Sequence, residues 1–453
     1  METDVTAHTS AADAAEAPWP KPAVGWYMVS VLMVAYIFSF IDRTILSLLV
    51  GPIRADLQIS DTQFSLLHGF AFALFYTMLG IPVATLADRK NRRNIIAIGV
   101  TFWSLATAAC GLTRDFLGLF LARVGVGVGE ATISPAAFSM IADTFPEERM
   151  GRAMGVYSVG AFIGIGLAFI IGGVVVGMVT AAETTSLLWV GEVRPWQMVF
   201  FIVGMPGILV ALWILTLREP VRRHSKKSML QQAGLLPLLR HMRQFWPAYT
   251  AHLVGFSLLG LLFNAMAAWI PTYLIRTFGV TAGDAGLWLG GILLVFSTAG
   301  LLVGSWLTDR MRARGATDAT MRVGLLSCIC LLPFTLTATT VSSLALSLVL
   351  FAPLVFFSTF AWGAAAAAIQ VITPSRMRAT GSAIYLFFLN LIGIGCGPTL
   401  VAVVTDYGFG DDSAIGLSLA VVSSITAPVA ALFIWMGLRS FRQAAAHVSS
   451  THS

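Results

Sequence analysis

Four ionisable residues stand inside otherwise apolar stretches of the sequence: Asp42, Arg43, Arg123 and Glu130. An ionisable side chain in the hydrocarbon layer of a membrane costs about 2.5–3.5 kcal/mol even on insertion scales, so its presence there indicates a function. A carboxylate can take up and release a proton, and an arginine can bind an anionic group such as phosphate or carboxylate. These residue types predict a site that couples protons to the binding of an anion.

The spacing of these residues predicts which of them meet. With a rise of about 1.5 Å per residue, Asp42 and Arg123 come to lie about 9 Å from the midplane on the same side, and Glu130 lies close to it. Arg123 and Glu130 share one helical face, whereas the neighbours Asp42 and Arg43 diverge by about 100°. We therefore expect Asp42 to pair with Arg123, and Arg43 to reach Glu130. The alternative is two static ion pairs that hold helices together, although buried pairs are weak evidence for stability.

The elements that must carry these charges are membrane helices. Of the 453 residues, 57% are hydrophobic and only 11% are charged, which excludes a cytosolic enzyme, a disordered protein and a secreted disulfide scaffold. About 20 apolar residues cross a hydrocarbon layer of about 30 Å, and at these lengths only helices satisfy their backbone groups in lipid. Twelve such runs lie at 25–50, 64–87, 94–112, 116–142, 153–180, 196–217, 246–275, 285–308, 320–339, 344–372, 380–405 and 414–438.

The distribution of Lys and Arg predicts the orientation of these helices. If residue 1 is inside, only four of the 28 basic residues fall in outer loops (Arg54, Arg114, Arg194 and Arg276), and the same loops hold nine acidic residues. Basic loops stay in the cytoplasm, so both termini are expected there, at the plasma (inner) membrane if the cell is bacterial. The first twenty residues lack an apolar run with a cleavage site, which predicts a disordered cytoplasmic tail rather than a signal peptide.

The two parts of the chain repeat each other at an offset of 221 residues, which relates Ser60 to Thr281 and Asp88-Arg89 to Asp309-Arg310. The fold class is therefore predicted to be an all-α integral membrane protein with twelve transmembrane helices in two pseudo-symmetric six-helix halves. Such halves place a substrate site between them, near the midplane. The expected division is a tail (1–24), an N-terminal half (25–217), a basic cytoplasmic linker (218–245), a C-terminal half (246–438) and a cytoplasmic tail (439–453).

Two stretches resemble signatures of the major facilitator superfamily. The run GIPVATLADRKNRR at 80–93 is similar to its loop 2–3 signature, and RVGVGVGE at 123–130 to its helix 4 signature. More narrowly, Ile41-Asp42-Arg43, Phe102-Trp103-Ser104 and Gly129-Glu130-Ala131 resemble the spinster branch, whose members export lysolipids and sphingosine phosphate-type amphipaths. Asn91 departs from the usual Gly of the loop signature, and 160–166 lacks the Pro of the antiporter motif, so no transport direction follows.

The resemblance also implies an inner gate at the cytoplasmic side. In the superfamily, a charged cluster at this place resembles a latch across the two halves that steadies the outward-open state. The alternative is that its basic residues only set the orientation. The candidate gate residues are Asp88, Arg89, Arg92, Asp143, Arg149, Asp309 and Arg310.

The C-terminal half is expected to line the substrate cavity differently, as an apolar wall, because none of its spans carries a charge near the midplane. Aromatic and amide residues stand there instead: Phe263, Asn264, Trp269, Phe296, Phe357, Trp362, Tyr385 and Asn390. A cavity with one charged and one apolar wall suits a substrate with a polar head and a hydrocarbon tail. Substrate-binding candidates are Arg43, Arg123, Asn264, Tyr385 and Asn390, although ordinary helix packing is the alternative for each aromatic.

These features predict a secondary active transporter that works by alternating access as a monomer. Asp42 and Glu130 are the candidate proton carriers, and the expected partners are protons, the lipid bilayer and a small amphipathic anion such as a lysophospholipid or sphingosine phosphate-like lipid. A proton-coupled sugar-acid or organic-anion symporter of the same superfamily is the alternative.

Other classes find little support in the sequence. A P-loop run is absent, so ATP is not the expected energy source. Neither a nucleophile–base set nor metal ligands stand at membrane depth, so we expect no enzyme, no cofactor and no metal, and a membrane sensor would need a larger soluble domain. A nucleic-acid partner is not expected either. The four cysteines lie in apolar runs and are predicted to be buried small hydrophobes.

Overall fold

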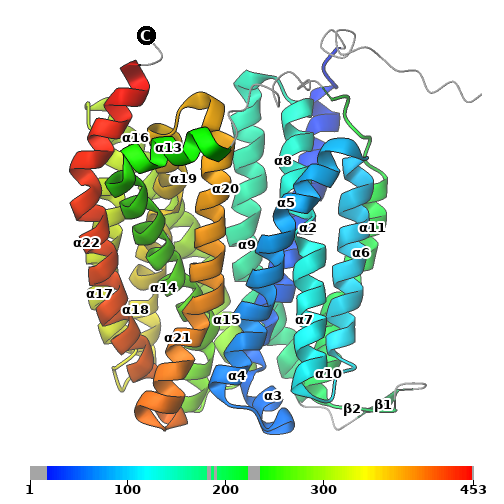
Figure 1. Cartoon of the computed structure of the whole chain (residues 1–453). Coiled ribbons are helices and arrows are strands. Elements are labelled where there is room, and N and C mark those ends of the chain that lie inside the picture. Colours follow the sequence, from blue (N-terminus) through cyan, green and yellow to red (C-terminus); the bar gives the residue numbers. More distant parts are fainter. Residues whose placement is uncertain (1–17, 181–184, 188–190, 223–234, 451–453) are drawn as a thin grey trace, which may run out of the picture.

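The computed structural model describes residues 18–180, 185–187, 191–222 and 235–450. It contains twelve helices that are long and apolar enough to cross a membrane, which confirms the predicted all-α membrane architecture. Two bundles lie side by side, and α2 (Pro22–Thr44) begins at the face where α22 (Ile415–Ser450) ends (Figure 1). We call this the terminal face and the other the distal face.

Six spans make up each half, and several of them consist of more than one segment. After α2, the N-terminal half contains η1 (Ile45–Leu48), α3 (Val50–Leu57), α4 (Asp61–Ser65), η2 (Leu66–Phe70), α5 (Ala71–Arg89), α6 (Arg92–Cys110), α7 (Phe116–Glu130), α8 (Ile133–Thr144), α9 (Glu147–Thr180), β1 (Thr185–Leu187), β2 (Gly191–Val193), α10 (Pro195–Gly204) and α11 (Pro206–Leu215).

The linker helix α13 (Leu235–Gln244) leads into the second half. Its elements before α22 are α14 (Trp246–Phe278), α15 (Ala282–Ile292), η3 (Leu293–Ser297), α16 (Thr298–Ala313), α17 (Ala319–Ala338), α18 (Leu344–Phe360), α19 (Trp362–Ile372), η4 (Ser375–Met377), α20 (Arg378–Phe388), η5 (Leu389–Cys396), α21 (Gly397–Val403), η6 (Val404–Phe409) and η7 (Asp412–Ala414).

A short hairpin, in which β1 and β2 pair antiparallel, links the fifth and sixth spans and leaves the predicted all-α membrane fold unchanged. One finding differs from the sequence-based expectations. Of the four cysteines, Cys110 and Cys328 are buried as expected, but Cys330 is half-buried and Cys396 is exposed. A short apolar run predicts a helix but not which of its faces turns inward, and this is why the expectation failed for Cys396.

Three spans that meet at the seam between the halves contain π-helical turns. These turns are η2 in the second span, η3 in the eighth, and η5 and η6 in the eleventh. η2 packs against η5, and η3 packs against α9 of the other half. A π turn widens the helix by one residue and is frequent at functional sites. The seam is therefore built from helices whose regular hydrogen bonding is interrupted where they meet.

The halves approach each other most closely toward the distal face. A Cβ atom added to Gly286 of α15 would lie 2.6 Å from Cα of Gly173 in α9, and one added to Gly166 would lie 2.7 Å from Cβ of Leu294. Only glycine allows backbones to pack this closely. Toward the terminal face, the main packing partners of α20 are α14, α19, η4 and η5 of the C-terminal half and the linker helix α13.

Candidate functional site

The predicted charges come from two helices that end beside them. α2 carries Asp42 and Arg43 in its last turn, and η1 continues the span. α7 carries Arg123 and ends at Glu130, where a short break precedes α8. The glycines of α7 bring it close to α5 and α6: a Cβ added to Gly127 would lie 2.8 Å from the Phe72 carbonyl oxygen. Both helix ends thus place charged side chains between α2 and α7, inside the N-terminal half.

Arg43 and Glu130 form the ion pair that the spacing predicts. Arg43 Nε donates to Glu130 Oε2 at 2.6 Å, with 16% of the arginine side chain exposed and none of the glutamate. The guanidinium carbon lies 4.3 Å from the Phe72 ring centroid and 4.9 Å from that of Tyr76, so it also makes cation–π contacts. Arg43 therefore has one side on a buried carboxylate and aromatic rings, and another that is accessible.

Arg123 meets Asp42, but not in the predicted way. Its Nη1 donates to the backbone carbonyl oxygen of Asp42 at 3.2 Å, and within the described part of the chain it makes no ion pair with the Asp42 carboxylate. Both side chains are buried, and Arg123 has no exposed surface at all. The expected carboxylate pair is therefore wrong for this conformation, because helix geometry fixes the depth of a residue but not its rotamer.

All four buried charged side chains retain unused hydrogen-bonding atoms. Arg43 Nη2, Glu130 Oε1, Asp42 Oδ1, and Nε and Nη2 of Arg123 have no partner among the described residues, although all are buried. Buried polar groups are nearly always paired, so such a concentration of unused atoms requires an explanation. Their number suits a site that exchanges partners, because a rigid structural ion pair would use these atoms.

The C-terminal candidates occupy different environments. Tyr385 is buried, with its ring centroid 4.7 Å from that of His252, and it lines a small apolar pocket together with Trp362 and Phe256. Asn264 donates its side-chain amide to the Gly260 carbonyl oxygen of its own helix at 2.8 Å. Asn390 lies half-buried in η5. Trp362 also touches the N-terminal half, with its ring centroid 5.8 Å from that of Phe162.

The other members of the aromatic wall are spread over several environments. Phe263 is buried beside Trp362, whereas Phe296 is partly exposed. Phe357 stacks on Phe334. Trp269 lies toward the distal face, where its indole nitrogen donates to the Pro398 carbonyl oxygen. Only part of the predicted wall thus gathers around one pocket.

On the terminal face, Arg92 is the centre of a buried ionic cluster. It pairs with Asp143 and, at 2.7 Å, with Glu219, and it donates to the Pro220 carbonyl oxygen at 2.9 Å. Arg92 and Asp143 belong to the N-terminal half, and Glu219 begins the chain that leads to the second half. This cluster fixes the start of the linker to one half.

The remaining gate candidates do not bridge the halves in this conformation. Arg89, Arg149, Asp309 and Arg310 are exposed, and among the described side chains none of them forms an ion pair. Arg310 lies over the Trp306 ring at 5.4 Å. The side chain of Asp88 falls outside the described ones.

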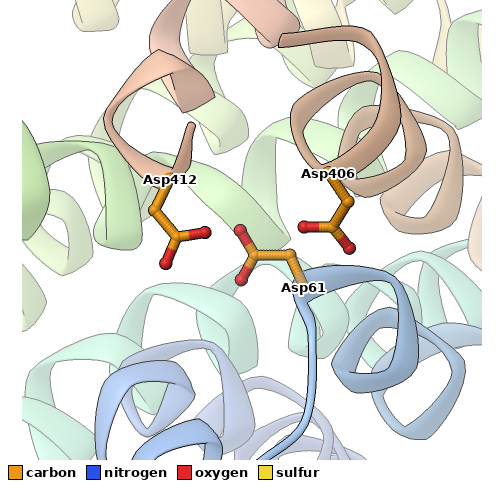
Figure 2. Close-up of side chains that lie close together, drawn as sticks. All are labelled: Asp61, Asp406 and Asp412. Carbon is orange, nitrogen blue, oxygen red and sulfur yellow. The ribbon is translucent and has the colours of Figure 1, made fainter. Parts of the chain in front are cut away.

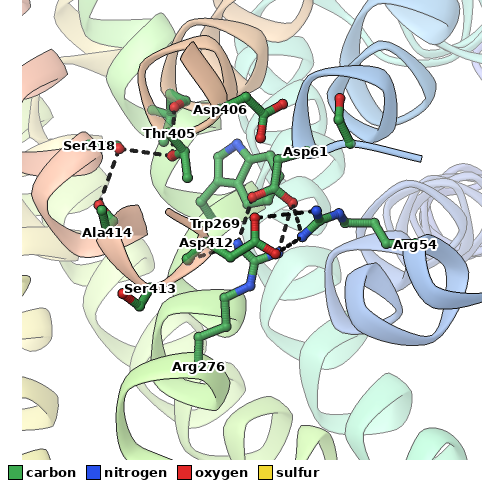
Figure 3. A network of polar contacts seen from close by, with 12 residues as sticks. Arg54, Asp61, Trp269, Arg276, Thr405, Asp406, Asp412, Ser413, Ala414 and Ser418 are labelled. Atoms are coloured by element: carbon green, nitrogen blue, oxygen red, sulfur yellow. Dashed lines mark hydrogen bonds and ion pairs between the residues drawn. The ribbon is translucent and has the colours of Figure 1, made fainter. Parts of the chain in front are cut away.

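A charged network on the distal face joins the two halves. Sequence reasoning did not find this network. Arg54 and Asp61 of the N-terminal half meet Arg276, Asp406 and Asp412 of the C-terminal half (Figures 2 and 3). The signal was in the sequence: Arg54 and Arg276 are two of the four outer basic residues, and each precedes the repeat positions Ser60 and Thr281 by five or six residues.

The acidic surroundings favour the charged form of Arg54. Partial burial acts to lower the pKa of the Arg54 guanidinium, but the hydrogen bond to Asp412 and the charges of Asp61, Asp412 and Asp406 outweigh it and raise that pKa. Ser60 caps α4 in a capping box with Gln63, which fixes the helix start that carries Asp61. The network thus sits on a locally well-determined turn.

Twelve membrane-spanning helices in two halves, with buried charges at a seam and a closed distal end, define the class of membrane transport proteins. Residues 32–398 match the model of the Major Facilitator Superfamily, so the chain belongs to that family. Fold and family point to a transporter rather than an enzyme.

Several relatives with known names align over most of the chain. An MFS-type efflux pump of Mycolicibacterium smegmatis is 27% identical, with 97% of this chain and 98% of the relative covered. The probable L-galactonate transporter of Escherichia coli is 27% identical over 89% and 87% of the two chains. Protein spinster homolog 1 of Xenopus tropicalis is 27% identical over 84% and 72%.

A solved structure agrees with the fold of the whole chain. The crystal structure of a bacterial homolog of the human lysosomal transporter spinster, in an inward-facing and unoccupied conformation, superposes with a TM-score of 0.77. It is 26% identical and covers 95% of this chain and 99% of its own. Together with the spinster relatives, this similarity confirms that the protein is a spinster-like member of the superfamily.

Proposed function

We propose that the protein is a proton-coupled secondary transporter that moves an amphipathic anion of lysolipid type by alternating access. The observation that carries this proposal is the pair of Arg43 and Glu130: a partly accessible guanidinium held by a fully buried carboxylate, each with one unused polar atom. Protonation of Glu130 neutralises it and weakens its hold on Arg43, which then binds an anionic headgroup. Return of the proton to solution restores the pair.

Asp42 and Arg123 act as a second, more deeply buried proton site. Arg123 has unused N–H donors from which an ionised Asp42 carboxylate can accept hydrogen bonds. A change in the charge of Asp42 therefore changes the local packing of α2 against α7. Arg123 binds substrate only in a conformation that exposes it. The apolar pocket beside Trp362 and Tyr385 receives the hydrocarbon tail. Asn264, which donates to the carbonyl oxygen of the lining residue Gly260, and Asn390, which follows the lining residue Leu389, supply polar contacts next to it.

Orientation follows from the basic residues at the terminal face, which we place in the cytoplasm of a cell whose plasma (inner) membrane holds the protein. The closed distal network then makes this conformation inward-facing. The exposed Arg89, Asp309 and Arg310, with Asp88, Arg92, Asp143 and Arg149, form the inner gate only after the halves rock toward the outward-open state. A sugar-acid symporter is the second candidate, supported by the L-galactonate relative and by arginines that suit a carboxylate equally well.

Purified protein in liposomes tests the coupling and the substrate together. Under an imposed pH gradient, we expect lysophospholipid transport to follow the gradient in the wild type and to lose its pH dependence in Glu130→Gln or Asp42→Asn, because neither variant can exchange a proton at that position. Glu192→Gln, which neutralises a carboxylate in β2, is the matched control and keeps the dependence. Unchanged pH dependence in both site variants removes the proton role. Transport of hexuronates without lysophospholipids selects the symporter instead.

A further inference from the structure

The distal network contains two ion pairs that cross between the halves, and both are bidentate. Arg54 contacts Asp412 at 2.6 and 3.3 Å, and Arg276 contacts Asp61 at 2.6 and 2.8 Å (Figure 3). Paired N–H···O bonds of this kind are the stronger and more directional form of arginine–carboxylate contact. Two fixed pairs therefore hold the distal face closed.

Each arginine also has a carboxylate of its own half within reach. Arg54 Nη1 lies 3.0 Å from Oδ1 of Asp61, and Arg276 Nη2 lies 3.9 Å from Oδ2 of Asp412. Arg276 Nη1 further donates to the Asp412 carbonyl oxygen at 3.1 Å. The four charges thus form a ring in which contacts across the seam alternate with contacts inside one half.

We propose that these four residues are an ion-pair exchange lock: when the distal face opens, Arg54 turns from Asp412 to Asp61, and Arg276 turns from Asp61 to Asp412. Each half then carries its own neutral pair. No charge is left without a partner in either state, which matters because an unpartnered buried charge is far more costly than the loss of one pair. The ring holds the closed face and still permits opening.

The burial of the ring supports exchange over simple dissociation. Asp61 is fully buried and forms ion pairs with both arginines, whereas the Asp412 side chain is 54% exposed. If Arg54 and Arg276 both left Asp61, a buried carboxylate would remain alone, so one of them must stay. Arg54 is the residue that can, because it belongs to the same half and its Nε is already anchored on the Ile59 carbonyl oxygen at 3.1 Å.

Two neighbouring contacts across the seam must break without a replacement when the distal face opens. Thr62 N donates to Asp406 Oδ2 at 2.7 Å, at the start of α4 where the helix dipole favours a negative charge. Beneath it, the ring centroids of Phe64 and Trp269 lie 6.2 Å apart across the seam. Three carboxylates thus converge on one point in the closed state (Figure 2), and separation of the halves relieves that crowding.

Charge neutralisation, with the distance between the two halves as the readout, is the first test of the exchange. Spin labels on Leu112→Cys and Ser342→Cys, both exposed in distal loops of different halves, report the opening of the full-length protein in a cysteine-free background in lipid nanodiscs. Because exchange gives Asp61 and Arg276 a charged partner in both states, we expect Asp61→Asn and Arg276→Gln to change the open-to-closed ratio by less than about threefold, whereas a lock whose crossing pairs break without replacement predicts a rise of at least about tenfold. Arg194→Gln is the matched control, because it breaks the distal pair with Asp56 inside one half, and it leaves the ratio unchanged.

Charge reversals at two or four of these positions distinguish exchange from a plain lock, in which the crossing pairs break on opening without a replacement. R54D/D61R keeps the pair inside the N-terminal half but turns both crossing pairs into like charges, so it stays open. R54D/D61R/R276D/D412R restores all four contacts and returns the wild-type ratio. D61R/R276D keeps both crossing pairs but leaves only like charges inside each half after opening, so it opens less than the fourfold variant.

Equal opening of D61R/R276D and the fourfold variant, or a rise of at least about tenfold in Asp61→Asn, would contradict exchange and leave a lock whose crossing pairs break without replacement. A wild-type ratio in R54D/D61R would exclude both. Because the exchange presupposes the alternating access proposed above, inter-half distance is measured in place of transport. A protein that opens as expected but moves no lysolipid would refute the substrate and leave the exchange standing.

Discussion

Single residues in this protein derive their role from what surrounds them. Arg43 is an example, because its guanidinium combines a carboxylate, aromatic faces and an accessible edge that Arg123 lacks. The sequence indicated all four buried charges through their cost in lipid, and it predicted the contact of Arg43 with Glu130 from helical spacing. It could not predict that Arg123 would bind the Asp42 carbonyl oxygen, since that choice depends on rotamers and on the end of α2.

A conservative substitution at Arg43 separates charge from shape. Arg43→Lys keeps the positive charge but replaces the planar fork that lies on Phe72 and Tyr76 by a point charge. We expect an unchanged elution profile and melting temperature but an increase of about tenfold in the apparent KM for the anion, which corresponds to about 1.4 kcal/mol. Transport kinetics in liposomes measure this. Arg310→Lys, an exposed arginine over Trp306, is the control, and equal KM values for the two variants would mean that Arg43 contributes only its charge.

At the level of elements, close packing and interrupted helices decide how the halves meet. The π turns in η2, η3 and η5 were not predicted, because an inserted residue leaves the hydropathy pattern of a span unchanged. The predicted spans were correct because length and apolarity determine them alone. The close approach of α9 and α15 through Gly173 and Gly286 was not predicted, because a glycine in a span does not tell which helix packs against it.

Two glycines of α15 offer a matched test of this packing. A Cβ at Gly286 would meet the backbone of α9, whereas a Cβ at Gly291 has open space around it. Gly→Ala inside a helix otherwise stabilises it by about 0.5–1 kcal/mol. We therefore expect Gly291→Ala to keep or raise the melting temperature in detergent, and Gly286→Ala to lower it and to widen the Leu112–Ser342 distance. A Gly286→Ala variant as stable and as closed as Gly291→Ala would show that the approach of α9 and α15 does not hold the distal face.

For the whole molecule, the repeat and the charge distribution predicted two halves but not which end of their seam is closed. Both ends carry charged clusters, around Arg92 and around Asp61, and alternating access requires the two closed arrangements to be close in free energy. The difference is connectivity: Arg92 and Asp143 pair inside one half, whereas Asp61 and Arg276 pair across the seam. Spacing along the chain cannot reveal which pairs cross the seam, because the pairing depends on the conformational state and not on the fold alone.

Orientation is the property of the whole molecule on which the names inward and outward depend. Exposed residues lie on each face, Ser342 in a distal loop and Gln443 near the end of α22. In a cysteine-free background, we expect a membrane-impermeant maleimide added to intact cells to label Ser342→Cys and to spare Gln443→Cys until the cells are opened, because a face rich in Lys and Arg favours the cytoplasmic side. Labelling of Gln443→Cys in intact cells would invert the membrane orientation. The exchange lock would then close the cytoplasmic side, and the Arg92 cluster would face outward.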